Sequence, residues 1–596
     1  MAVDGRAKTA FFPLLLRAEM SKFAVAKFYY TMRNWKLSSV LAVLALAGCG
    51  AQVSENDAAL KFSPDASEIR TLTIPGGKTV SYTAYEQIYY VTNVEDSTYQ
   101  FLNFYVPEEA DQSTPILLRT YVGGYMASAA KTPSATDASG RALAEGYVVC
   151  IPGARGSNSK VGDVYTGRAP RGLLDLKAAV RYLRLNDKLM AGDAEKIFTD
   201  GTSAGGAMSS LLGATGNAPC YESYLQEMGA ASTRDDVFAA ICYCPITDLD
   251  HADMAYEWLY SCTNDGVRAL SDEQKAVSEQ LAAAYPEYVN SLGLKDAGGN
   301  AITADNFLDY IKTFIIASAQ KARNEGCDIP EGIGFEFNSP GFGGGRPAGA
   351  PQTGQGRPQG APADAHQASQ VPPQGSPAGA HQAGQVPPQG SPAGAPQAGQ
   401  DHPKGAPQGL PGGSKKPQGD PKDDGRTPPS FGPGGVSMPK MQGEFVVDVD
   451  MPTYLSYVAG VTRLKNPPAF DTEGVAGGRP SAENSVFGDA TGATANFTPF
   501  SAGCNGGTID EEMAERVRIM NPLNFIGTSE STTAPHWYIR HGARDRDTAF
   551  PVPVILATKL MNEGYDVDFA LPWNRPHSGD YNLDDLFEWM AEVLAE

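Results

Sequence analysis

The sequence lacks the motifs by which metalloenzymes and nucleic-acid-binding proteins are usually recognised. It contains no Cys-x-x-Cys and no His-Glu-x-x-His pattern, so we expect no metal and no other cofactor. Basic residues are the minority, with 47 Lys and Arg against 68 Asp and Glu and a formal net charge of −21. Because no polybasic run occurs and nucleic acids are bound through clustered positive charge, we expect no nucleic-acid partner.

The apolar run near the N-terminus, residues 37–47, is too short to span a bilayer as a helix. It follows the basic segment Met32-Arg-Asn-Trp-Lys36 and ends at Leu46-Ala-Gly-Cys49, which resembles a bacterial lipobox. The pattern predicts a signal segment over residues 1–49, with Cys49 lipidated after cleavage. We therefore expect an exported, cell-surface or periplasmic lipoprotein of a bacterium, which meets the membrane only through its lipid anchor.

Two details of this N-terminal region stay open. Met32 is the expected start of translation, with Met20 as the alternative. A plain signal peptide in which Cys49 is incidental is the competing interpretation. Residues 50–67 are expected to form a flexible tether ahead of the folded protein.

Cysteine is scarce, with eight residues in the chain. Once Cys49 is assigned to the lipobox an odd number remains, so at least one thiol is free or pairs between chains, and the connectivity cannot be read from sequence. Cys150, Cys242 and Cys244 lie in apolar, strand-like runs. We expect these three to be thiols of the core.

A low-complexity tract rich in Pro and Gly occupies residues 339–442. Inside it, residues 366–380 recur as 381–395 with one change, Ser369 to Gly384. Few apolar side chains are present, so this tract cannot bury enough surface to offset the entropy of ordering. We expect it to be disordered.

Over its full length the chain is 42% hydrophobic, which is enough for a large core. Runs rich in β-branched and aromatic residues predict strands at 79–83, 87–91, 101–106, 116–121, 147–151, 196–200, 238–243, 536–541 and 567–571. Helical spacing is found at 139–145, 171–185, 207–212, 271–285, 306–324, 454–464, 552–563 and 583–594. Strands that alternate with helices favour a parallel sheet flanked by helices, an α/β fold.

The alternation stops after Pro245 for almost three hundred residues. This interruption predicts a large helical lid domain, residues 247–518, inserted after the sixth strand and containing the disordered tract. Residues 68–246 and 519–596 would then form the core of the fold.

The motif Gly201-Thr-Ser-Ala-Gly-Gly206 lies between a predicted strand and a predicted helix. Gly-x-Ser-x-Gly in that context is typical of the nucleophile elbow of the α/β-hydrolase fold, in which a tight turn presents the serine to a cleft. Ser203 is therefore the candidate nucleophile, and the N–H of Ala204 would face a developing oxyanion. The glycine pair in Val122-Gly-Gly-Tyr125 stands where such a fold places its second oxyanion donor. Glycine-rich surface turns are the competing interpretation of both stretches.

Histidine is limited to seven residues, and three of them lie in the low-complexity tract. In this fold the order along the chain is serine, acid, histidine, with the histidine on a loop after the last strand. His577 follows the strand predicted at 567–571 and is the candidate base. His541 is the rival, and His251 is expected to be structural or to belong to the lid.

The candidate acid is one of two aspartates, Asp545 and Asp547, which follow the strand predicted at 536–541. In extended chain, residues i and i+2 share a face, whereas a bend separates them. One carboxylate would orient the histidine and the other would face the pocket, and their spacing does not decide between them.

Several stretches together resemble bacterial tannase (tannin acyl hydrolase). The likeness runs from about Val80 to the end, apart from the Pro/Gly tract. It rests on Val122-Gly-Gly-Tyr125, Gly201-Thr-Ser-Ala-Gly-Gly206, Tyr243-Cys-Pro-Ile246, His251-Ala-Asp-Met-Ala-Tyr-Glu-Trp258, Phe487-Gly-Asp489, Arg540-His-Gly-Ala543, Asp545-Arg-Asp-Thr548, Asp568-Phe-Ala-Leu-Pro-Trp573 and Pro576-His-Ser-Gly-Asp-Tyr581.

The resemblance implies a serine esterase that hydrolyses galloyl esters of hydrolysable tannins and releases gallic acid through an acyl-enzyme. It implies Ser203, Asp545 and His577 as the catalytic triad. It also implies the N–H groups of Gly124 and Ala204 as the oxyanion hole.

The same resemblance implies three substrate-binding charges, Lys465, Glu483 and Asp547. A galloyl ring carries three adjacent hydroxyls, which two carboxylates and an ammonium can bind as acceptors and donor. Two features depart from the family: the Pro/Gly tract, and Ala482 where the family has a proline before the glutamate.

Two other functions remain as alternatives. One is a broader carboxylesterase acting on feruloyl or simple aryl esters. The other is a non-catalytic, surface-binding lipoprotein in which the Pro-rich repeat is the working part.

Overall fold

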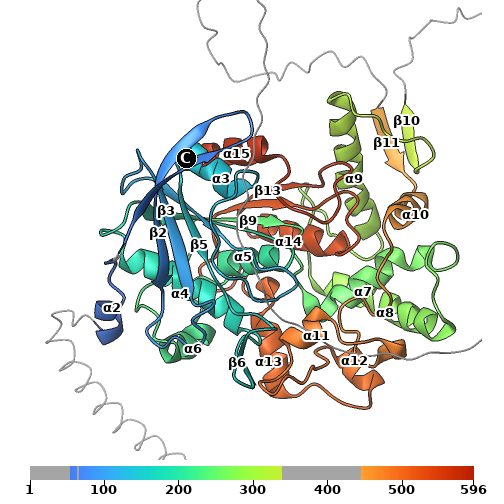
Figure 1. Cartoon of the computed structure of the whole chain (residues 1–596). Helices are drawn as coiled ribbons and strands as arrows, with labels where there is room; N and C mark the ends of the chain where they lie inside the picture. The colour runs from blue at the N-terminus through green and yellow to red at the C-terminus, as the bar shows by residue number, and fades with distance from the viewer. Residues whose placement is uncertain (1–53, 64–65, 339–444) are drawn as a thin grey trace, which may run out of the picture. The chain divides into compact units, whose positions relative to one another are not determined.

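The computed structural model describes residues 54–63, 66–338 and 445–596 (Figure 1). Within these residues nine strands form one sheet in the order β1-β2-β3-β5-β4-β8-β9-β12-β13. The strands are β1 Glu68–Thr73, β2 Thr79–Tyr89, β3 Phe101–Pro107, β4 Pro115–Arg119, β5 Val148–Pro152, β8 Asp193–Thr202, β9 Ala239–Tyr243, β12 His536–Arg540 and β13 Asp566–Ala570. The strands from β5 to β13 pair in parallel, and β1, β2 and β3 extend the sheet antiparallel. This sheet confirms the α/β-hydrolase fold.

Helices cover both faces of the sheet, as the near-continuous apolar sequence of its central strands requires. On one face, α3 (Ala138–Ala144) and α15 (Leu583–Ala595) pack with strand residues into one hydrophobic cluster. On the other face, α4 (Arg171–Leu185), α5 (Ala204–Ala214) and α14 (Pro551–Asn562) contribute to a larger one. Strands β5, β9 and β12 are buried along their whole length between these layers.

The edge of the sheet differs from the sequence-based expectation. The strands expected at 79–83 and 87–91 are one strand, β2, which continues through an irregularity between Tyr85 and Ile88. Gln87, at this irregularity, has φ 59°. Strand β1 was not predicted and adds one strand ahead of β2. Among the described strands of this sheet the insertion follows β9, which is the sixth strand in chain order counted from β2 and the seventh when β1 is included.

The segment expected to be a flexible tether is partly folded. Residues 54–63 include α2 (Glu55–Ala59), which Ser54 caps by accepting a hydrogen bond from the backbone N–H of Asp57. Leu60 is buried in the larger cluster. The Asn186 side chain holds the segment by accepting from the N–H of Phe62 at 2.7 Å and donating to the carbonyl of Leu60 at 3.0 Å. The expectation of a tether is corrected for these residues because their apolar side chains reach the core.

In the described part of the chain between β9 and β12, helices are the main regular elements, as expected. Its helices are α7 Leu249–Tyr260, α8 Asp272–Ser291, α9 Phe307–Asn324, α10 Met451–Val461, α11 Ala482–Val486, α12 Pro499–Cys504 and α13 Glu511–Ile519. The short strands β10 (Phe335–Asn338) and β11 (Phe445–Val449) pair antiparallel within it. The described part of this insert contributes Tyr285, Phe307 and Tyr454 to the larger cluster, so insert and core share packed surface.

Shorter elements complete the described chain. They are β6 Lys160–Val161, β7 Val164–Tyr165, α6 Glu222–Glu227 and the 3₁₀ turns η1 Pro219–Tyr221, η2 Ser261–Thr263, η3 Val475–Gly477 and η4 Pro522–Asn524. The expected signal segment with Cys49 and the tract 339–442 lie outside the described residues.

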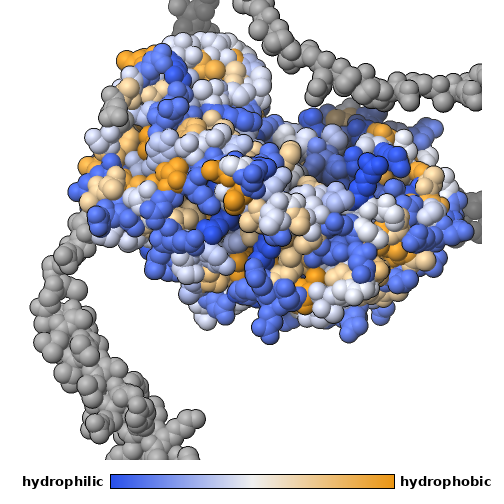
Figure 2. All heavy atoms as spheres, turned by 60° about the horizontal axis from the view of Figure 1, so that its bottom comes forward, coloured by the Kyte–Doolittle hydropathy of each residue, from blue (hydrophilic) through white to orange (hydrophobic). Residues whose placement is uncertain are grey.

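The three cysteines expected in the core can be located in the structure. Cys150, Cys242 and Cys244 are buried free thiols, which confirms that they belong to the core. None of the helices that the structure describes is both long and apolar enough to cross a membrane. Figure 2 shows one face of the molecule, on which hydrophobic residues are scattered among hydrophilic ones, as on most protein surfaces.

Candidate active site

Ser203 lies between the last residue of β8 and the first residue of α5, with φ 63° and ψ −123°. This region is sparsely populated for a residue with a side chain, and such strain is common at functional sites. The turn is closed by backbone contacts that leave no room for side chains. A Cβ atom on Gly201 would lie 2.2 Å from the carbonyl oxygen of Gly205, and one on Gly206 would lie 2.5 Å from that of Tyr243. The glycines of the motif are therefore required by the geometry of the elbow.

Loops that follow β12 and β13 bring two further residues of the predicted site to Ser203. The Nε2 atom of His577 lies 2.8 Å from the Oγ atom of Ser203. Its Nδ1 atom lies 2.7 Å from an Oδ atom of Asp545. This chain of hydrogen bonds allows His577 to accept the hydroxyl proton while Asp545 fixes the ring and its tautomer.

The environment of this chain keeps Asp545 ionised. Burial acts to raise the pKa of Asp545, but the two imidazoles of His541 and His577 outweigh it, and the pKa lies below its ordinary value. Burial acts to lower the pKa of His577, but the hydrogen bond and charge of Asp545 outweigh it, and this pKa is raised. The ion pair formed when His577 takes a proton is therefore stabilised within the site.

Tyrosines of the insert fix the loop that carries Asp545. Tyr260 of α7 donates a hydrogen bond to the backbone carbonyl of Asp545 at 3.1 Å. Tyr256, on the same helix, donates to the carbonyl of Arg546 at 2.6 Å, and Tyr454 of α10 donates to that of Ala543. The insert thus positions the acid of the core.

The two expected oxyanion donors flank the elbow. Ala204 is the first residue of α5, so its N–H is one of the amide groups that a helix leaves without an intrahelical acceptor. Gly124 has φ 55°, a conformation that glycine adopts without steric cost. Its neighbour Tyr125 is buried and donates to the carbonyl of Ile246 at 2.8 Å, while the N–H of Ile246 donates to the carbonyl of Ser203. These contacts hold the glycine pair beside the serine.

The three residues expected to bind substrate lie around this centre. Asp547 follows Asp545 on the same loop, and its N–H donates to the Asp545 carboxylate at 2.8 Å. Asp547 and Lys465 both act on the pKa of His577, the first raising it and the second lowering it. The ammonium of Lys465 lies 3.8 Å from the centre of the Phe470 ring.

The third residue, Glu483, approaches the site from the insert. It is a buried residue of α11, and its negative charge adds to burial in raising the pKa of Tyr125. Glu483 therefore lies on the side of the site where the glycine pair is placed. The exposed Ala482 precedes it in the helix.

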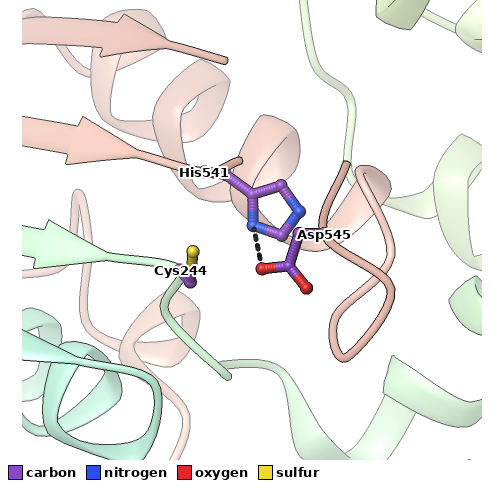
Figure 3. Close-up of side chains that lie close together, drawn as sticks. All are labelled: Cys244, His541 and Asp545. Carbon is purple, nitrogen blue, oxygen red and sulfur yellow. Dashed lines mark ion pairs between the residues drawn. The ribbon is translucent and has the colours of Figure 1, made fainter. Parts of the chain in front are cut away.

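The rival histidine, His541, lies next to Asp545, whereas the histidine hydrogen-bonded to Ser203 is His577. Figure 3 shows His541, Asp545 and Cys244 close together, with an imidazole nitrogen of His541 3.6 Å from a carboxylate oxygen of Asp545. His541 is fully buried, and burial lowers its pKa. His251 stacks on Tyr288 in the insert, with ring centres 3.6 Å apart.

Three groups of side chains in the described residues have the spacing of metal ligands. They are Cys244 with His541 and Asp545, Asp545 with Asp547 and His577, and Asp248 with Asp250 and His251. The first two share Asp545, whose carboxylate already holds His577, and the third is closed by hydrogen bonds among its own members and Asn521. Hydrogen bonds therefore link members of the second and third groups, whereas in the first group both ring nitrogens of His541 lack a hydrogen-bond partner among the described residues.

Sequence reasoning missed several residues that touch this centre. Cys244 was expected only as a core thiol, yet its sulfur lies 3.3 Å from the carbonyl oxygen of Ser578, next to His577. Arg119 and Asp580 form an ion pair beneath the His577 loop. Cys244 and Asp580 lie in stretches that resemble the family, but those stretches do not indicate which residues they contact. Arg119 lies in none of them, although the strand order places β4 next to β8 and so indicates that Arg119 lies near the elbow.

Comparisons with known proteins agree with the class that this fold and site define, an α/β-hydrolase that cleaves esters. The family described as BD-FAE matches residues 102–291. The esterase LipC of Mycobacterium tuberculosis is 30% identical over 120 residues, and the match spans 20% of this chain and 27% of LipC.

Solved structures narrow the class to one family. The crystal structure of Fusobacterium nucleatum tannase is 32% identical, with a TM-score of 0.67, and the match covers 90% of this chain and 99% of the tannase. The native tannin acyl hydrolase of Lactobacillus plantarum is 31% identical with a TM-score of 0.66, again over 90% and 99% of the two chains. A tannin acyl hydrolase in complex with ethyl gallate matches with the same values. The chain belongs to the bacterial tannase family.

Proposed function

We propose that this protein is a serine esterase that hydrolyses the galloyl ester bonds of hydrolysable tannins and simple gallate esters. The observation that carries the proposal is the hydrogen-bonded series from Ser203 through His577 to Asp545. It is supported by the family to which the chain belongs and by the related tannin acyl hydrolase in complex with ethyl gallate.

In the proposed reaction, the Oγ atom of Ser203 attacks the ester carbonyl carbon while His577 takes the hydroxyl proton. The N–H groups of Ala204 and Gly124 stabilise the negative charge on the carbonyl oxygen. The tetrahedral intermediate collapses, His577 protonates the departing alcohol, and a galloyl ester of Ser203 remains. A water molecule, deprotonated by His577, then attacks this ester. His577 gives the proton to the departing Oγ atom of Ser203, and gallic acid is released.

Specificity in this proposal comes from charges that meet the ring hydroxyls. The carboxylates of Glu483 and Asp547 accept hydrogen bonds from phenol hydroxyls, and the ammonium of Lys465 donates one. An ester without those hydroxyls would leave Glu483 and Lys465 without these hydrogen bonds, and would leave Asp547 with only its ion pair to Arg546. Sites built in this way can reject such analogues by about 10⁴-fold or more.

The experiment that tests the proposal is hydrolysis of methyl gallate by the purified wild-type protein and by Ser203→Ala. We expect turnover by the wild type and a loss of about 10⁴-fold or more in the variant. A panel of gallate, protocatechuate, ferulate and benzoate esters separates a tannase from the broader carboxylesterase. Preference for ferulate over gallate would refute the galloyl assignment, and equal activity of wild type and variant would refute the nucleophile.

We also propose export and lipid anchoring through Cys49, supported by the basic segment, the apolar run and the lipobox. Cys49→Ser should release the protein from the membrane fraction of the producing bacterium. Metabolic labelling with a fatty acid should mark the wild type and leave the variant unlabelled. Labelling of both would show that Cys49 is not the lipidated residue.

A further inference from the structure

A buried arginine joins the segments that carry Ser203 and His577. Arg119, the last residue of β4, forms ion pairs with both Asp200 and Asp580. The side chain of Arg119 is 5% exposed, that of Asp200 is fully buried, and that of Asp580 is 19% exposed. A forked guanidinium can meet two carboxylates at once because its donors point along different directions in one plane.

The two aspartates lie close in sequence to the two catalytic candidates that they flank. Asp200 lies in β8 three residues before Ser203, and Asp580 lies three residues after His577. The same guanidinium therefore ties the strand that leads into the elbow to the loop that leaves the histidine. The geometry points to Arg119 and Asp580 as positioning residues that hold His577 within hydrogen-bonding distance of Ser203. This inference rests on the proposed serine-esterase function.

Other contacts show that the loop is fitted closely at this point. One carboxylate oxygen of Asp580 accepts from Arg119 at 2.8 Å and from the N–H of Ala138 at 3.2 Å. A Cβ atom on Gly579 would lie 2.0 Å from the hydroxyl oxygen of Thr202, the residue before the serine. The backbone of the His577 loop thus rests directly on the elbow strand, and the ion pair closes it from one side.

Arg119 is the residue that offsets the negative charges of Asp200 and Asp580. Burial raises the pKa of Asp200, and the charge of Arg119 opposes that rise. Without the arginine, Asp200 and Asp580 would face each other as two carboxylates with little solvent, which is unfavourable. Removing Arg119 outright would therefore confuse positioning with folding, so the informative changes are conservative ones.

Asp580→Asn is the sharpest variant. Asp580 has φ 58°, and asparagine is among the residues that tolerate this left-handed conformation best. The variant keeps size and backbone shape, leaves Arg119 paired with Asp200, and removes only the charge that holds the loop. Displacement of a catalytic group by about 1 Å can cost about 100-fold in rate. We therefore expect kcat for methyl gallate to fall about 10- to 100-fold, with KM changed less than about threefold.

A matched control is available on the same segment. Asp584 forms an ion pair with Arg141 at 2.7 Å, and its side chain is 86% exposed. Asp584→Asn removes an equal charge without touching the His577 loop, so its kcat should remain that of the wild type. Arg119→Lys changes the other partner of the ion pair. Lysine keeps the positive charge but lacks the forked guanidinium, so this variant should show the same loss of kcat as Asp580→Asn. The double variant Arg119→Lys with Asp580→Asn should lose little more kcat than either single variant.

Readouts that a merely structural role would not move are the pH profile and the reactivity of the serine. In a folded Asp580→Asn protein, the acid limb of the kcat/KM profile should shift, and labelling of Ser203 by a fluorophosphonate should slow in proportion to kcat. Wild-type kcat, pH profile and labelling in folded Asp580→Asn would overturn the inference. If Asp580→Asn does not fold, Arg119→Lys decides in the same way.

Failure of the proposed galloyl specificity would be seen separately. A wild type that hydrolyses p-nitrophenyl acetate but not methyl gallate would refute that specificity, and the same variants would then be compared on p-nitrophenyl acetate. A wild type that neither turns over esters nor reacts with the fluorophosphonate would refute both proposals.

Discussion

The phenol hydroxyl of Tyr260 donates a hydrogen bond to the backbone carbonyl of Asp545, so a helix of the insert holds the acid of the core site. Both residues are fully buried. The inserted segment is therefore not simply a cover over a finished site: its helices α7 and α10 help to build the loop on which Asp545 stands.

Tyr260→Phe should remove this support while preserving the ring packing. A buried carbonyl that loses its donor costs about 1 kcal/mol in the free energy of unfolding, and the loop should become less well fixed. We expect that loss in urea denaturation, together with a several-fold fall in kcat. Tyr89→Phe serves as the control, since Tyr89 is 44% exposed in β2 and should change neither quantity. Unchanged kcat in Tyr260→Phe would show that the acid loop does not need the insert.

The pH dependence of hydrolysis follows from the raised pKa of His577. The base must be neutral to take the proton of Ser203, so kcat/KM should be low in acid and rise with pH through the pKa of His577. Because Asp545 raises this pKa, the rise should be centred above the ordinary histidine value of 6.5. Asp545→Asn should move any residual profile to lower pH and reduce kcat by about 10³-fold or more. A residual profile at unchanged pH would mean that another group sets the acid limb.

The space around each glycine predicts whether an alanine can replace it. Gly201→Ala places a Cβ atom 2.2 Å from a backbone carbonyl oxygen, which no rotation of a side chain can relieve. We expect this variant to be strongly destabilised, by about 3 kcal/mol or more, or not to accumulate in soluble form. Gly460→Ala, in α10 with open space around its Cα, should instead leave the unfolding free energy unchanged or raise it by up to about 1 kcal/mol. Thermal unfolding distinguishes the two.

Asp547→Asn should change specificity more than general catalysis. The residue is partly exposed beside His577, and the amide keeps its shape but loses the charge that would accept from a phenol hydroxyl. We expect kcat/KM for methyl gallate to fall about 100-fold relative to that for methyl benzoate, since losing a charge-assisted hydrogen bond costs about 1.5–3 kcal/mol. Equal losses on both esters would place Asp547 in the catalytic step rather than in recognition.

Removal of residues 339–444 tests whether the Pro-rich repeat is the working part. Asn338 of β10 pairs with Phe445 of β11, so the ends of the tract are neighbours and a two-residue Asn-Gly turn can join them. We expect the shortened protein to fold and to hydrolyse methyl gallate with the wild-type kcat. Loss of ester hydrolysis on this deletion would contradict a site built entirely from the residues on either side of it.

The chemistry that is local in sequence was predictable, whereas contacts made by folding were not. Gly201, Ser203 and Gly205 form one turn, so their spacing alone indicated an elbow, and chain order then selected His577. The roles of Asp545 and Asp547 depend on a bend after β12, and residue spacing left them open until the resemblance to tannases assigned them. In the structure the carboxylate of Asp545 lies 2.7 Å from the Nδ1 atom of His577.

Other contacts could not be read from residue spacing or chain order. Arg119 and Asp580 are 461 residues apart, and a lone arginine at a strand end does not reveal its partner. The segment 54–63 reads as polar chain, because its docking depends on Leu60 and on the side chain of Asn186 far along the sequence. Lys465 and Glu483 would have been taken for surface charges without the resemblance, since such residues are rarely buried unless paired.

The antiparallel pairing of β10 with β11 has a consequence for how this protein can diverge. Whatever sequence lies between the two strands leaves and returns at adjacent points, and closing a longer loop costs only about 0.6 kcal/mol for each doubling of its length. Repeat expansion or contraction by slippage during replication would therefore leave the enzyme intact. Lineages should differ in the length of this tract far more than in any other part of the chain.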